Sequence, residues 1–115
     1  MDEYIWRVED ENGYGVYSAH LCELERMYNK HADIGFPVYP CPIDDKGINR
    51  DIEGHEICGF TSKEQALTWF SKYELRRMKK FGFELKKVAV LLITATGERQ
   101  VLAIRKEKVL YETCK

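Results

Sequence analysis

The sequence lacks a long hydrophobic run. Its longest uninterrupted apolar stretch covers residues 88–93, whereas a helix that crosses a membrane needs about 20 apolar residues. The first residues are acidic and polar and do not contain the apolar segment of a secretion signal. We therefore expect a cytoplasmic protein that does not enter a membrane.

A large excess of charge of either sign is also missing. Eighteen Lys and Arg residues face nineteen Asp and Glu residues, which gives a formal net charge of -1. This balance creates no field over the whole molecule that would attract nucleic acid or an anionic lipid surface. Binding to either would have to come from a local patch.

Cysteine is scarce, and its spacing is not that of a metal site. The chain has four cysteines, namely Cys22, Cys41, Cys58 and Cys114. They form no C-x-x-C pair, so we expect reduced thiols. The nearest approach to a zinc pattern is His20 with Cys22 and His55 with Cys58, but zinc needs four converging ligands, and helix residues two apart point about 200° away from each other. We predict no metal site and no bound cofactor.

The composition does support a folded core. Hydrophobic residues make up 44% of the chain and aromatic residues 12%, which is enough apolar surface to offset the entropy of ordering the chain. A length of 115 residues is near the commonest domain size. We expect residues 1–115 to form a single domain.

The N-terminal third predicts two short strands followed by a helix. Residues 4–8 alternate and are rich in aromatic and β-branched side chains, and turn glycines at 12–15 precede a second short strand at 16–17. Ser18 is expected to cap a helix that ends near residues 29–32. Its apolar residues recur every three or four positions, and His31 falls on the same stripe.

Two helices with cap signals follow a short predicted strand at 55–60. Thr61 or Ser62 can cap the first helix, with Glu64 in capping-box position after Thr61. The second helix has a capping box formed by Ser71 and Glu74, and Gly82 is expected to end it.

The C-terminal part predicts a hairpin. Residues 83–94 have the β-branched density of a central strand, and residues 100–106 alternate across a turn at Thr96 and Gly97. Since helices and strands are segregated along the chain, the fold class is predicted as α+β. We expect an antiparallel sheet with three helices packed mainly on one side and a C-terminal β-hairpin.

A long loop is predicted at about 33–54. It contains all three prolines and shows no sustained period. Loops of this length inside compact domains are usually functional or disordered, so this one is the first place to look for a site. The alternative is a surface excursion pinned by Phe36, Val38 and Tyr39.

Aromatic residues are the predicted contact points for a partner, because aromatic and Arg side chains dominate interface hot spots. The candidate binding residues are Trp6, Tyr14, Tyr39 and Trp69. The two tryptophans are equally candidates for core anchors. With these residues exposed, we expect the protein to bind another protein.

A local basic stripe supports an alternative, nucleic-acid binding. It consists of Lys72, Arg76, Arg77, Lys79 and Lys80. These side chains could contact phosphates while neighbouring aromatic rings stack on bases. Basic residues are also expected in the last turn of a helix, where they complement its dipole.

Three motifs carry a resemblance to a known group of proteins. They are W-R-V-E-x-x-x-G-x-G-x-Y at 6–17, C-G-F-x-S-x-E-Q-A-x-x-W-F at 58–70 and I-T-A-T-G-E-R-Q-V-L-A at 93–103. Together they resemble small uncharacterised proteins encoded by bacteriophages and prophages of enteric bacteria. The resemblance implies a bacterial cytoplasm and an accessory role, such as binding and modulating a host protein or a defence factor.

A second, fainter likeness concerns ADP-ribosyltransferases, which would imply NAD binding. Arg7 on the first strand, Ser62 before a middle helix and Gln100 on a late strand occur in the order of that family's motif residues. Gln100 stands where the family has its catalytic Glu, so the resemblance implies a protein without activity. The alternative is that Gln100 is a polar residue on the outer face of a hairpin strand. Apart from Arg7, Ser62 and Gln100 in this likeness, we predict no catalytic residues.

Overall fold

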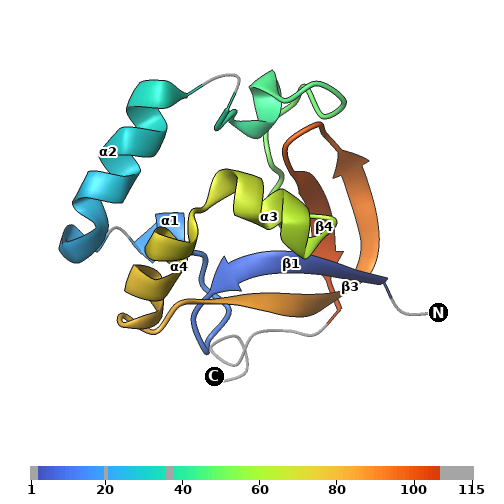
Figure 1. Cartoon of the computed structure of the whole chain (residues 1–115). Coiled ribbons are helices and arrows are strands. Elements are labelled where there is room, and N and C mark those ends of the chain that lie inside the picture. The colour runs from blue at the N-terminus through green and yellow to red at the C-terminus, as the bar shows by residue number, and fades with distance from the viewer. Residues whose placement is uncertain (1–2, 20, 36–37, 107–115) are drawn as a thin grey trace.

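The computed structural model describes residues 3–19, 21–35 and 38–106. Its elements, with 3-10 helices labelled η, follow in the order β1 (Glu3–Glu9), α1 (Val16–Ala19), η1 (Cys22–Leu24), α2 (Glu25–Ile34), η2 (Pro42–Asp44), β2 (Glu56–Gly59), α3 (Lys63–Trp69), α4 (Lys72–Lys79), β3 (Glu84–Thr96) and β4 (Val101–Arg105). Figure 1 shows α1, α3 and α4 beside one another over a curved sheet, with α2 farther out. The predicted α+β fold class is confirmed.

Within the described residues the sheet has four antiparallel strands in the spatial order β1-β3-β4-β2. The long strand β3 pairs with β1 along its first half and with β4 along its second half. Two register shifts interrupt the β3–β4 pairing, and such bulges bend and twist a strand. β3 and β4 form the predicted C-terminal hairpin.

The sheet curls until its two edges meet. Trp6 of β1 and Phe60, just after β2, exchange backbone hydrogen bonds with N···O distances of 2.7 Å in both directions. Gly59 stands at the meeting point, where a Cβ atom would lie 2.6 Å from the Trp6 carbonyl oxygen and 2.7 Å from Ile5 Cδ1. Glycine is therefore needed where the two backbones approach, and the contact gives both edge strands a partner.

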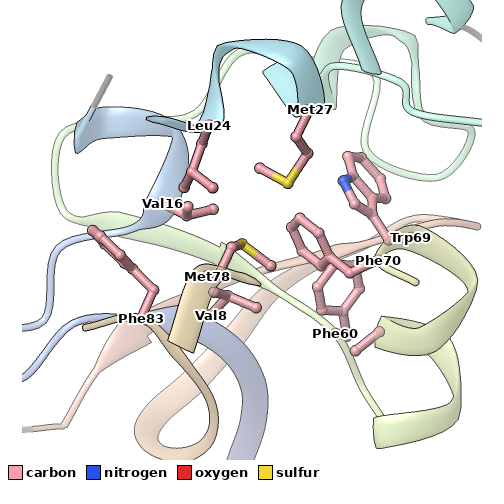
Figure 2. Packing of buried hydrophobic residues seen from close by; sticks show 10 residues of the cluster. Val8, Val16, Leu24, Met27, Phe60, Trp69, Phe70, Met78 and Phe83 are labelled. Atoms are coloured by element: carbon pink, nitrogen blue, oxygen red, sulfur yellow. The ribbon is translucent and has the colours of Figure 1, made fainter. Parts of the chain in front are cut away.

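Most buried apolar side chains of the described residues belong to one of two groups. The first group, the sheet interior, is aliphatic and contains Ile5, Val88, Val90, Val101 and Ala103. The second group, the aromatic layer, lies between the sheet and the helices and contains Val8, Val16, Leu24, Met27, Phe60, Ala66, Trp69, Phe70, Met78 and Phe83 (Figure 2). In β4 the residues 101–103 are fully buried, and Val101 and Ala103 belong to the sheet interior.

The start of α3 differs in detail from the expected capping box. Ser62 is the N-cap, and its Oγ accepts a hydrogen bond from the backbone N–H of Gln65 at 3.0 Å. The Gln65 side chain returns the bond by accepting from the N–H of Thr61 at 2.8 Å. Glu64 takes no part in this exchange, because the N-cap is Ser62 and not Thr61. The capping-box position three residues after the cap is therefore Gln65. The neighbouring Leu67 is 36% exposed, and Trp69 takes the buried place.

The predicted capping box of α4 is confirmed. Ser71 Oγ accepts from the N–H of Glu74 at 3.1 Å, and the Glu74 carboxylate accepts from the N–H of Ser71 at 2.8 Å. After the helix, Gly82 has a φ of 89°, which glycine adopts without strain. The N–H of Phe83 then donates to the Met78 carbonyl oxygen at 3.1 Å, so the chain folds back as expected.

The predicted strand at 16–17 is wrong, since these residues begin α1. A single bridge joins Gly15 to Glu9, and the free edge of β1 is already bonded at Trp6 to Phe60. A longer strand after Gly15 would need the same edge. The chain turns away instead, and Val16, only 2% exposed, enters the aromatic layer.

The single helix expected after Ser18 is also wrong. Ser18 lies within α1, and the chain passes through η1 before α2 begins at Glu25 without a side-chain cap. α2 ends at Ile34, beyond the expected residues, where Gly35 has a φ of 53°. No helix within the described ranges is long and apolar enough to cross a membrane.

Candidate functional site

The predicted loop is fastened to the β3–β4 turn by Asp45. This carboxylate is 1% exposed and accepts three successive backbone N–H groups, those of Glu98, Arg99 and Gln100, at 2.7, 3.1 and 3.1 Å. Gly97 leaves room for it, since a Cβ atom there would lie 2.5 Å from Asp45 Cγ. Figure 1 shows the loop beside this turn. A carboxylate with three such donors keeps a buried charge satisfied.

Two side chains of the hairpin reach back to the loop. Gln100 donates through Nε2 to the carbonyl oxygen of Pro40 at 2.7 Å. Arg99 donates to the carbonyl oxygen of Val38 at 3.0 Å and to that of Thr68 at 3.2 Å. The expectation that Gln100 faces outward is wrong, because it is 5% exposed and the loop covers it. The described part of the loop is therefore an ordered wall.

This wall closes one side of a half-open cavity of about 450 Å³. Segments far apart in the sequence contribute its lining: Arg7, Val8, Gly15, Val16, Tyr17, Tyr28, His31, Ala32, Tyr39, Pro40, Cys41, Pro42, Ile52, Glu56, Ile57, Cys58, Gly59, Phe60, Trp69, Phe70 and Gln100. Most of these side chains are apolar or aromatic. Binding sites for small molecules have this size and character.

Four polar side chains form a chain of hydrogen bonds along the cavity. Trp69 Nε1 donates to the Tyr17 hydroxyl at 2.7 Å, and that hydroxyl lies 2.6 Å from His31 Nδ1. His31 Nε2 lies 3.0 Å from the carboxylate of Glu74. The network joins α1, α2, α3 and α4 across the aromatic layer. In the sequence, the only indication of this network is His31 on an apolar helix stripe. The other members, Tyr17, Trp69 and Glu74, are 14, 38 and 43 positions away from it, so no local pattern connects them.

Burial fixes the protonation states in this network. Burial lowers the pKa of His31, although the nearby carboxylate of Glu74 opposes the shift. Burial also raises the pKa of the Tyr17 hydroxyl. At neutral pH the tyrosine therefore keeps its proton and donates to Nδ1 of a neutral imidazole, which donates through Nε2 to Glu74. The network is complete without a ligand.

Arg7 is the cation in the cavity lining. Its side chain is 13% exposed. Nε donates to Glu9 at 3.1 Å, and Nη1 donates to the carbonyl oxygen of Cys58 at 2.8 Å. Glu9 also accepts from Arg105, so two guanidinium groups share one carboxylate.

Glu56 is the other charged residue of the lining, and Arg50 of the loop neutralises it. The two side chains form a bidentate pair at 2.8 and 2.7 Å. Thr94 and the backbone N–H of Glu53 also donate to this carboxylate. The bonds from Arg50 are the largest cause that lowers the pKa of Glu56 to about 2. The pair joins β2 to the loop.

The predicted contact residues have different surroundings. Tyr14 is 43% exposed, whereas Trp69 is 8% exposed in the aromatic layer, so the alternative of a core anchor holds for Trp69. Trp6 is partly buried and packs against the same layer. Tyr39 is half-buried in the cavity wall, where its ring stacks on His31 at a centroid distance of 4.0 Å. Of the four residues, only Tyr39 and Trp69 line the cavity.

The residues of the ADP-ribosyltransferase likeness are not brought together as a set. Arg7 and Gln100 both line the cavity, but Ser62 does not and serves as the N-cap of α3. The amide of Gln100 is engaged with the loop. The likeness and NAD binding stay predictions.

The basic stripe lies on α4 and the residue after it, and all five side chains are exposed. Arg77 donates to the carbonyl oxygen of Glu23 and lies over the ring of Phe81. Lys79 lies 3.9 Å from Glu84. Trp69 is not available for base stacking because it is buried, and nucleic-acid binding stays a prediction.

The candidate metal ligands are scattered. Cys22 and Cys41 are exposed free thiols, and Cys58 is a half-buried one in the cavity wall. His20 and Cys114 lie outside the described residues. In the part of the chain that the structure describes, no three His, Cys, Asp or Glu side chains gather closely enough to hold a metal ion.

Comparison with known proteins finds a family that matches the chain. The family model for the bacteriophage T4 Y00F protein matches residues 1–115. A search of the curated proteins found no match, and neither did a search of the solved structures. The phage origin predicted from the three motifs is confirmed, while the enteric host stays a prediction.

Proposed function

The chain belongs to the bacteriophage T4 Y00F protein family, and we propose that it is a phage accessory protein that binds and modulates a protein of the bacterial host or of its defences. The observation that carries this proposal is the ordered loop. Its described part presents apolar side chains to solvent, while Arg99 and Gln100 bond its backbone and its own Asp45 bonds the backbone of the hairpin. Its place of action would be the bacterial cytoplasm.

Exposed apolar side chains of the described residues occur on this segment and also on β3. Ile34, Val38, Ile43 and Ile52 are 46%, 37%, 49% and 44% exposed. Where such side chains form one contiguous patch, they mark a protein interaction site. An ordered loop also loses less conformational entropy on binding than a flexible one. Both features favour a docking surface here.

The charged groups around the cavity support binding over catalysis. The imidazole of His31 and the carboxylate of Glu56 are both occupied by bonds within the protein. A general base must instead reach a proton on its substrate. The surface is better suited to recognition through apolar contact.

A capture experiment with matched variants tests the proposal. Tagged protein, an Ile43→Lys variant and a Leu91→Lys variant would be exposed to lysate of a phage-sensitive bacterium. Leu91 is 60% exposed on β3, so its substitution makes the same chemical change outside the loop. We expect a stoichiometric bacterial protein with the native chain and with Leu91→Lys, and its loss with Ile43→Lys.

Two results would contradict the proposal. Equal capture by both variants would show that the loop does not dock the partner. Recovery of nucleic acid alone, lost when Arg76 and Lys80 are replaced by glutamine, would favour the basic stripe. A calorimetric titration with NAD, repeated on an Arg7 variant, would test the transferase-like alternative.

A further inference from the structure

The cavity has a feature that the docking surface does not explain. One nitrogen of the Arg7 guanidinium group, Nη2, forms no hydrogen bond with any described residue, while Nε and Nη1 are both held. Gly15 keeps the space beside Nη2 open, because a Cβ atom there would lie 2.8 Å from it. The group is therefore fixed in position with one donor edge left for a ligand.

The charges near the cavity leave an excess of positive charge at this point. Arg7 and Arg105 share the single carboxylate of Glu9. Glu56, the only acidic residue among the described residues of the lining, is neutralised by its bidentate pair with Arg50. His31 is neutral because burial lowers its pKa. An anion that entered the cavity would thus find one uncompensated guanidinium charge in a low-dielectric setting, where charge-assisted hydrogen bonds are strongest.

The rest of the lining favours a flat apolar body. The rings of Phe60, Trp69 and Phe70 pack on one another with centroid distances of 5.7 and 6.2 Å, and Tyr39 contacts Trp69 edge-on at 5.4 Å. Such walls offer stacking contacts at little cost in side-chain entropy. Trp69 is also held in place, because its indole N–H donates to the Tyr17 hydroxyl.

We propose that this cavity binds a small molecule that carries an anionic group, a carboxylate or a phosphate, on an aromatic or other flat apolar body. The anionic oxygens lie against Arg7, and the body lies against the aromatic walls. This site shares the loop with the docking surface, since Ile52 lines the cavity as well, but it does not depend on the function proposed for that surface. A volume of about 450 Å³ is within the range of sites for small molecules.

The test is a titration followed by nuclear magnetic resonance, with the indole N–H signal of Trp69 as reporter and a Trp6→Phe variant to assign that signal. Naphthalene-2-carboxylate is compared with its neutral isostere, naphthalene-2-carboxamide, on the native chain. We expect the carboxylate to bind at least about tenfold more tightly, as a charge-assisted hydrogen bond implies. Naphthyl phosphate shows which anion is preferred.

Variants then locate the anion. Arg7→Met should weaken binding of the carboxylate at least about tenfold and leave the carboxamide unchanged. Gly15→Ala, which crowds Nη2, should weaken it in the same direction. Arg76→Met removes the same charge from the exposed face of α4 and should change nothing.

Several results would overturn the proposal. One is equal affinity for carboxylate and carboxamide in the native chain, which needs no variant to fold. Another is a Trp69 signal that does not move at about 10 mM probe. A third is much tighter binding of a peptide that ends in a free phenylalanine carboxylate, since that would assign the cavity to a protein terminus and not to a small molecule.

Discussion

The sheet interior and the aromatic layer bury apolar side chains in different ways. The sheet interior is filled by small, mostly branched aliphatic residues, and its members are at most 7% exposed. The aromatic layer holds larger side chains, among them the hydrogen-bonded ring of Trp69, and leaves a cavity beside them. Aliphatic side chains interlock at crystal-like density, whereas rings tied by hydrogen bonds keep their orientation even when space remains. The first region stabilises the fold, and the second shapes a site.

The largest expected effect lies in the sheet interior. Ile5→Ala removes a fully buried side chain from a place where the closed sheet cannot collapse. We expect the free energy of unfolding to fall by about 2–5 kcal/mol, measured by urea denaturation. A loss below about 1 kcal/mol would mean that this interior is not well packed.

The next effect concerns the fastening of the loop. Asp45→Ala leaves three backbone N–H groups without their acceptor, and each buried orphan costs about 1–3 kcal/mol. We expect lower stability and faster proteolysis within 38–54. Asp44→Ala is the matched control, since Asp44 is the exposed neighbour. Equal proteolysis of the two variants would show that the carboxylate of Asp45 does not hold the loop.

Acid should weaken the cavity side in two steps. Burial lowers the pKa of His31 in the folded chain, so below about pH 6.5 the unfolded chain binds the extra proton and stability falls as the pH falls. Glu56, whose pKa is lowered from 4.5 to about 2, stabilises the folded chain above pH 4.5 and loses this contribution as the pH falls toward 2.

Urea denaturation between pH 8 and pH 3 measures the upper step and the first part of the lower one. His31→Asn should flatten the upper one, and Glu56→Gln the lower one. The sheet interior contains no titrating group, so Val101→Ala should shift the whole curve without changing its shape. A His31→Asn curve parallel to that of the native chain would contradict the assignment of the upper step.

The smallest effect is expected at the cavity wall. Ile52→Ala makes the same chemical change as Ile5→Ala, but Ile52 is 44% exposed and borders space that is already open. We expect a loss of about 0.5 kcal/mol or less. A cost similar to that of Ile5→Ala would remove the distinction between the two regions.

The local signals of the sequence were sufficient for much of the fold. The cap at Ser71 with Glu74, the positive φ of Gly82 and the hairpin around Gly97 each depend on residues a few positions apart, and such interactions are visible in a sequence. The α+β class followed from the order of these elements. The strand expected at 16–17 failed because competition for an edge of β1 involves Phe60, more than 40 positions away.

The candidate site was much less predictable. The sequence names Arg7 and Tyr39 for other reasons, and Tyr17, Glu56 and Asp45 are not among its candidate site residues. Their roles depend on partners such as His31, Arg50 and the 98–100 backbone, which no spacing rule connects. Gln100 was placed on the outer face because alternation along a strand does not reveal that a loop covers it.

The amino-acid order by itself thus determined where helices are capped, where the chain turns and which strands pair as a hairpin, since these depend on backbone sterics and on hydrogen bonds between near neighbours. Only the tertiary structure decided that the sheet closes through Gly59, that Asp45 fastens the loop and that Arg7 keeps a donor edge in an apolar cavity. Those features need groups from distant segments to meet, and only folding of the whole chain brings these groups to bonding distance.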